Sequence, residues 1–271
     1  AGQVRVTVLL TIAGCPLKAT LTERVTTAVS GVEGVTGVDD SNWIDAGTPA
    51  GELAGGFGHA LVGTVVITLI ATIISVPIGL MTAIYLIEYG QEKRLARAIT
   101  FLVDVMTGIP SIVAGLFAYA LFALIFAPGV RMGFAGAVAL SVLMIPVVVR
   151  SSEEMLRLVP NELREAAYAL GVPKWKTILK IVLPTAFSGI VTGVLLGLAR
   201  VMGETAPLII LAPYFKSLST NLFGGLMGTL PTMIYNGKDN MAVDASAQRV
   251  WAAACTLILL ILLLNLLGRF I

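Results

Sequence analysis

The chain has 271 residues, of which 57% are hydrophobic and 13% are charged, and its mean hydropathy is +0.92. Such a composition cannot cover a soluble globule with polar surface, so lipid is expected to surround most of the chain. The net charge of +2 is small, and the dispersed basic residues lack the array of stacking aromatic residues typical of nucleic-acid binding. His59 is the only histidine, which excludes His-based metal clusters and most Ser-His or Cys-His catalytic sites.

Residues 1–38 differ in character from the rest of the chain. Residues 4–12 are rich in β-branched side chains and predict a strand, whereas residues 21–29 have one apolar face and predict a short helix. Residues 32–38 predict a turn and a second strand. A β-α-β fragment of this size is too short to fold alone.

Two runs in this fragment, residues 11–17 and 33–38, resemble part of the N-terminal domain of Mrp-type iron–sulfur carrier proteins. We interpret residues 1–38 as an anomalous, soluble-like fragment that replaces an expected first membrane helix, rather than as a natural fusion. Cys15 is then interpreted as an inert thiol rather than as an iron–sulfur ligand. Residues 39–60 are expected to form an extracytoplasmic linker.

Five stretches of residues 61–271 are long and apolar enough to cross a membrane, because about 20 helical residues span a typical hydrocarbon core. Several contain a proline, which membrane helices tolerate when neighbouring groups satisfy the freed backbone. We therefore expect a bundle of bent helices around a path. The predicted spans are Leu61–Ile87, Ile99–Phe126, Phe134–Val149, Phe187–Leu211 and Val250–Leu267.

Basic residues orient these spans, because Lys and Arg accumulate in the loops that stay in the cytoplasm. The segments after the first, third and fifth spans are more basic than those after the second and fourth. The segments after the first, third and fifth spans are therefore predicted to be cytoplasmic. Their basic residues are Lys93, Arg94, Arg97, Arg157, Arg164, Lys174, Lys176, Lys180 and Arg269.

The loop between the third and fourth spans, residues 157–184, holds the most informative motif of the chain. Residues 165–171 have the sequence Glu-Ala-Ala-Tyr-Ala-Leu-Gly, and Leu183-Pro184 ends the loop. Alanine combines a small side chain with high helix propensity, so a short helix here can approach a partner groove closely. Gly171 can end that helix in a left-handed conformation, and Pro173 then redirects the chain.

This motif resembles the cytoplasmic coupling loop of ABC importer permeases. Residues 108–117 and 199–208 extend the likeness, and from about Trp43 onward the chain is similar to the phosphate ABC transporter permease (PstA) family, especially its actinobacterial members. The resemblance implies an all-α, polytopic membrane helix bundle of the ABC importer permease type.

The resemblance also implies that Glu165, Ala166, Ala167 and Gly171 dock in a cleft of a separate ATPase subunit. From the residues alone, an ordinary amphipathic surface helix is the alternative. No Gly-x-x-x-x-Gly-Lys-[Ser/Thr] run occurs, so the chain cannot make the usual phosphate cradle for ATP. We therefore expect no cofactor in this chain, and ATP and Mg²⁺ on a partner subunit.

Arg200 and Glu204 are four residues apart near the end of the fourth span, so on a helix they share one face and could pair. Ionisable groups at membrane depth are functional candidates, and a guanidinium offers a planar fork of donors that matches an oxyanion. We expect Glu204 to keep Arg200 partly neutralised, so that phosphate passes. The resemblance supports this pair, because phosphate permeases carry it in a Gly-Glu-Thr-Ala-Pro context, here with Thr205. A helix-packing salt bridge and a snorkelling arginine are the alternatives.

Two other charges lie near the edges of spans. Asp104 is expected to pair with Arg94 or Arg97, because it lies close to the cytoplasmic basic cluster. Arg150 ends the third span and is expected to anchor it at the membrane interface.

Glu153 and Glu154 follow that anchor and are expected to be solvated. His59 precedes the first span and is expected to be interfacial. The segment of residues 214–247 is rich in Gly, Asn, Ser and Thr, and we predict that it lines the outer mouth and helps to receive a solute-binding protein. A space-filling loop is the alternative.

The sequence therefore predicts a multi-pass permease subunit of an ATP-driven phosphate importer in the bacterial cytoplasmic membrane. The resemblance implies four kinds of partner: a second homologous permease, two ATPase subunits, an extracytoplasmic phosphate-binding protein and inorganic phosphate itself. A permease for molybdate, sulfate or phosphonate is the nearest alternative. An ion-coupled secondary transporter would have repeated halves and no ATPase-docking loop, and an intramembrane enzyme would need a catalytic dyad that the sequence does not offer.

Overall fold

The computed structural model describes residues 56–90, 93–126, 129–215, 219, 221–238 and 244–270. These residues lie in helices, turns and loops, with no strand among them. The predicted all-α class is confirmed for this part of the chain. The predicted β-α-β fragment, Cys15 and most of the linker over residues 39–60 lie outside it.

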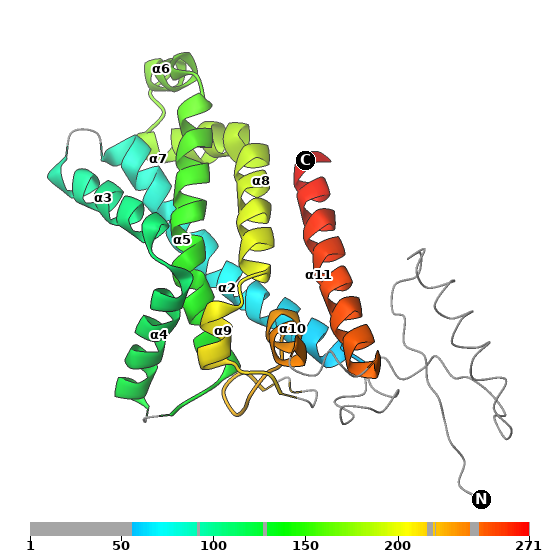
Figure 1. Ribbon diagram of the computed structural model, residues 1–271. Helices are drawn as coiled ribbons and strands as arrows, with labels where there is room; N and C mark the ends of the chain where they lie inside the picture. Colours follow the sequence, from blue (N-terminus) through cyan, green and yellow to red (C-terminus); the bar gives the residue numbers. More distant parts are fainter. Residues whose placement is uncertain are drawn as a thin grey trace, which may run out of the picture.

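Four long apolar helices dominate the described chain (Figure 1). Each is long and apolar enough to cross a membrane. They are α2 (Gly58–Ile84) with its π-helical continuation η1 (Tyr85–Tyr89), α5 (Gly133–Leu158), α8 (Leu183–Met202) with the preceding α7 (Lys174–Thr177) and π-helical η2 (Ile178–Val182), and α11 (Asp244–Phe270).

The second predicted span, Ile99–Phe126, is bent rather than straight. It consists of α3 (Arg94–Gly108) and α4 (Ser111–Ile125), which meet at an angle of 110°. Pro110 explains the break, because it lacks an N–H and disfavours helical geometry at Ile109, which has φ −71° and ψ 128°. With the bent pair counted as one span, the described helices offer five candidates, in agreement with the predicted number.

The fourth predicted span, Phe187–Leu211, is also interrupted. α8 ends at Met202, and the chain turns at Gly203 before the short α9 (Ala206–Leu211) begins. Pro207 lies in the first turn of α9, where its missing N–H costs no helical hydrogen bond. Glu204 therefore lies in the break and not on α8.

α5 is the central helix of the bundle and packs against both α2 and α8. Small residues permit the close approach of these helices. A Cβ on Gly79 of α2 would lie 2.7 Å from Cγ1 of Val148, and a Cβ on Gly193 of α8 would lie 2.5 Å from Cβ of Ser151. The main core cluster surrounds Met144, which is fully buried. Tight packing of this kind drives helix association where lipid offers no hydrophobic difference.

The two ends of the bundle carry different elements (Figure 1). α6 (Asn161–Ala169) and α7 lie at the same end as η1 and the C-terminal end of α11, whereas α9 and α10 (Leu230–Gly237) lie at the other end. The segments that carry the predicted cytoplasmic basic residues therefore gather at one end. We call it the inner end.

The opposite end contains more regular structure than the sequence predicted. The segment of residues 214–247 includes α10, which starts with a capping box between Thr229 and Thr232. His59 is buried against Tyr214, with 5.7 Å between the ring centroids. The position of His59 at the membrane interface stays a prediction. Burial also raises the pKa of Tyr214.

Candidate functional site

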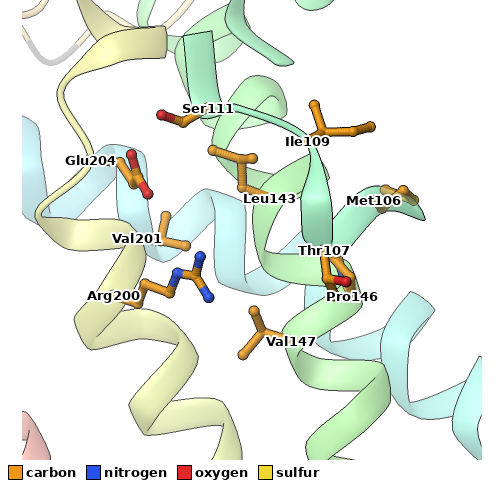
Figure 2. A pocket seen from close by; sticks show the side chains of 10 residues that line it. All are labelled: Met106, Thr107, Ile109, Ser111, Leu143, Pro146, Val147, Arg200, Val201 and Glu204. Carbon is orange, nitrogen blue, oxygen red and sulfur yellow. The ribbon is translucent and has the colours of Figure 1, made fainter. Parts of the chain in front are cut away.

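A pocket of about 130 Å³ opens where three irregular parts of the helices meet (Figure 2). The corner between α3 and α4 forms one wall, the part of α5 around Pro146 forms another, and the end of α8 with the break that follows forms a third. Proline prevents regular helix at the first wall and perturbs it at the second. The lining residues are Met106, Thr107, Ile109, Ser111, Leu143, Pro146, Val147, Arg200, Val201 and Glu204.

Arg200 provides the positive charge of this pocket. It lies in the last turn of α8, and its exposed side chain extends into the pocket toward Val147 (Figure 2). Within the described residues, Arg200 forms no ion pair with a carboxylate. Its guanidinium therefore keeps its planar fork of donors available for an oxyanion.

Glu204 lines the same pocket but does not share a helical face with Arg200. The predicted pairing fails because α8 ends at Met202, so the spacing of four residues no longer corresponds to one helical turn. Figure 2 shows that the Arg200 side chain leaves the helix, whereas the Glu204 side chain leaves the loop that follows it. The pocket thus contains the guanidinium of Arg200 and, further along the same wall, the carboxylate of Glu204.

Thr205 was predicted to belong to this site, but it is not among the lining residues. Its hydroxyl faces the backbone instead, 3.5 Å from the carbonyl oxygen of Gly203. Thr107 and Ser111 were not predicted from the sequence, although their side chains line the pocket near the α3–α4 corner. Their positions on either side of Pro110 could have indicated that they lie at a break.

The loop between α5 and α8 forms the short helix that its motif predicts. α6 ends in a Schellman motif, in which the Val172 N–H donates to the Ala167 carbonyl over 3.1 Å and the Gly171 N–H donates to the Tyr168 carbonyl over 2.9 Å. Gly171 has φ +73°, so the predicted left-handed end of the helix is confirmed. The next turn of helix, α7, starts only after Pro173.

The faces of α6 differ sharply in exposure. Ala167 is buried against the bundle, whereas Glu165, Ala166 and Tyr168 are exposed at the inner end. Partial burial, followed by the charge of the nearby Glu88, raises the pKa of Tyr168. α6 thus offers a partner an exposed surface with the small Ala166 and two carboxylates, Glu162 and Glu165.

Four charged residues near the inner end form one network, and two predictions about them are wrong. Arg150 pairs with Asp104 and, over 2.8 Å, with Glu153, so Asp104 does not pair with the nearby α3 arginines. Glu153 also pairs with Arg157 over 2.5 Å and is only 5% exposed, so it is not solvated. Glu154 is exposed, as predicted.

No group of three His, Cys, Asp or Glu side chains that could hold a metal ion occurs among the described residues. The chemistry that the pocket can supply is therefore hydrogen bonding and charge.

Residues 75–271 match the family described as the inner membrane component of binding-protein-dependent transport systems. The chain belongs to this family. The match contains both the Arg200 pocket and the α6 loop. The chain is thus a membrane permease that works with a substrate-binding component and with a separate ATPase, and it is not itself the ATP-hydrolysing subunit.

Proteins with known roles resemble this permease over most of its length. It is 53% identical over 221 residues to phosphate transport system permease protein PstA 1 of Mycobacterium tuberculosis (strain ATCC 25618 / H37Rv), covering 81% of this chain and 70% of that protein. It is 40% identical over 244 residues to the phosphate transport system permease protein PstA of Yersinia pestis, covering 88% of this chain and 80% of that protein.

Solved structures confirm the fold. An inward-facing structure of the MetNI methionine ABC transporter matches with a TM-score of 0.60 at 21% identity, covering 78% of this chain and 90% of that chain. The crystal structure of an amino acid ABC transporter with histidines matches with a TM-score of 0.58 at 19% identity. The match covers 79% of this chain and 94% of that chain. At these identities, the likeness is one of fold.

Proposed function

We propose that this permease forms half of the membrane pathway of an ATP-driven phosphate importer. Support comes from the relatives named as phosphate transport system permeases, which are up to 53% identical over about four fifths of this chain. The observation that carries the proposal is the position of Arg200, an exposed guanidinium without an ion pair in the described chain, inside a pocket of about 130 Å³.

Arg200 binds the phosphate transiently in this proposal. A guanidinium donates two parallel hydrogen bonds to an oxyanion, and these bonds are stronger than neutral ones because both partners are charged. Glu204 limits the strength of this binding, because its carboxylate repels the same anion across the pocket. A pathway must bind its solute weakly enough to release it.

α6 is the docking element for the ATPase. Glu165 and Ala166 face outward, Ala167 packs against the bundle, and Gly171 ends the helix. Two ATPase subunits bind ATP and Mg²⁺ and draw this loop together with that of a second, homologous permease. An extracytoplasmic phosphate-binding protein delivers the solute at the opposite end of the bundle, where α10 lies.

The test is transport by the complete complex in vesicles. We expect phosphate uptake that requires ATP and the binding protein, and ATP hydrolysis that the loaded binding protein stimulates. Competition of molybdate, sulfate and phosphonate with phosphate uptake tests the nearest alternative, a permease for another oxyanion. If that alternative were true, one of these three anions would be taken up in preference to phosphate. Uptake driven by an ion gradient without ATP would contradict the proposal.

A further inference from the structure

Glu88 is a carboxylate buried at the inner end of a membrane helix. It belongs to η1, the π-helical continuation of α2, and its side chain is only 4% exposed. A buried ionised group is tolerated only when it is paired and hydrogen-bonded. Its partner, Arg164, lies 76 residues further along the chain, in the α6 loop.

Arg164 connects three elements through one guanidinium. Its Nε donates to Oε1 of Glu88 over 3.0 Å, its Nη1 donates to the carbonyl of Val159 over 2.6 Å, and its Nη2 donates to the carbonyl of Leu156 over 2.9 Å. The two carbonyls belong to the C-terminal end of α5, where a helix has unsatisfied acceptors and favours a cation. The side chain of Arg164 is 12% exposed, so water screens these contacts little.

Lys174 adds a second connection from the other side of the turn at Gly171. Its ammonium donates to the backbone carbonyl of Glu88 and lies 5.0 Å from the ring centroid of Tyr89. Both helices of the loop, α6 and α7, are therefore attached to η1.

We propose that Glu88 is a positioning residue that transfers the movement of the α6 loop to α2. This inference rests on the proposed function, in which α6 receives the movement of the ATPase. The backbone joins the loop directly only to α5 and α8, so α2 depends on side chains to follow. A π-helical turn has an irregular hydrogen-bond ladder and is frequent at functional sites, so η1 is a suitable place for α2 to bend.

The experiment compares three single variants and one double variant in the complete complex in vesicles. Glu88→Gln removes the charge and keeps the volume, Arg164→Lys keeps the charge and loses the fork, and Arg164→Gln removes both. We expect Glu88→Gln and Arg164→Gln to lower phosphate uptake per ATP hydrolysed about tenfold, with Arg164→Lys between them and the wild type. The double glutamine variant should be no worse than either single variant, because the pair acts as one unit.

Glu154→Gln is the matched control. It makes the same chemical change at an exposed carboxylate of the same end of the bundle, one that forms no ion pair within the described residues. Its uptake per ATP should equal that of the wild type. If the Glu88–Arg164 pair served only stability, its variants would reduce the amount of assembled complex and leave the uptake per ATP unchanged, and that result would overturn the proposal.

A second readout does not depend on the solute. Spin labels at Met81 of α2 and Ile258 of α11, both exposed, report how α2 moves when ATP is added. The labels require a chain in which Cys15 and Cys255 are replaced by serine. We expect an ATP-dependent change of distance that Glu88→Gln abolishes, whereas an unchanged response would overturn the proposal. Absence of ATP-driven phosphate uptake in the wild type, with this distance change intact, would instead contradict the proposed function.

Discussion

Gly115 in α4 lies directly against Pro207 in α9, so that a Cβ on Gly115 would be only 2.7 Å from Cα of Pro207. The two helices follow the two breaks that line the pocket: α4 starts after the Pro110 corner, and α9 starts after Glu204. Their contact therefore fixes the wall that carries Ser111 relative to the wall that carries Glu204.

Gly115→Ala should separate these helices, because the added carbon meets backbone that cannot rotate away. We expect a loss of stability of about 1–3 kcal/mol, as for other overpacked sites, and slower phosphate uptake. The control is Gly108→Ala, since a Cβ at Gly108 meets nothing within 4 Å. Thermal unfolding and uptake of the two complexes provide the comparison, and equal effects would mean that the close contact is unimportant.

Gly171→Ala should weaken binding of the ATPase. The backbone at Gly171 has φ +73°, and a side chain there meets open space, so any cost is purely conformational. We expect that cost to be about 1–2 kcal/mol for alanine and smaller for asparagine, which tolerates the left-handed region. The affinity of the ATPase for the purified permease pair measures this difference, and identical affinities for the alanine variant and the wild type would refute it.

Glu153→Gln should destabilise the permease much more than Glu154→Gln. Glu153 is 5% exposed between Arg150 and Arg157, so removal of its charge leaves two arginines without their shared partner. We expect a cost of about 2 kcal/mol for Glu153→Gln and less than about 0.5 kcal/mol for the exposed Glu154. Thermal unfolding of the detergent-solubilised complex tests both variants, and similar values would show that the network adds nothing to stability.

Glu204→Gln should make the permease hold phosphate more tightly and transport it more slowly. Without the negative charge, Arg200 binds the anion without opposition, which lowers the KM for phosphate and also the turnover rate. Glu204→Asp keeps the charge and should behave more like the wild type. A higher KM in the glutamine variant would mean that Glu204 assists binding rather than opposing it.

Local rules of the sequence predicted the bundle, bent helices at prolines and the left-handed glycine, but not the breaks within the second and fourth spans. Membrane helices are recognisable in a sequence because their apolar runs are long enough to span a bilayer. Gly171 followed by Pro173 specifies the end of α6 through backbone sterics alone. The site was predicted in part: Arg200 and Glu204 do line one pocket, but a helical spacing was assumed across a turn that begins at Gly203.

Contacts between distant parts of the chain were not predictable from the sequence. Arg164 binds Glu88 across 76 residues, and Arg150 binds Asp104 across 46 residues. Each of these carboxylates has several arginines within reach along the sequence, so tertiary packing and not spacing selects the partner. The burial of His59 was not predicted for the same reason, because it depends on Tyr214, which lies far along the chain.

The central claim is that Arg200 binds the transported phosphate, and an Arg200→Gln variant tests it most directly. The complex should assemble normally, because Arg200 forms no ion pair within the described chain, while phosphate uptake should fall about 100-fold through loss of two charge-assisted hydrogen bonds. Arg200→Lys keeps the charge without the planar fork and should retain part of the activity. Uptake by the Arg200→Gln complex at the wild-type rate would contradict the account.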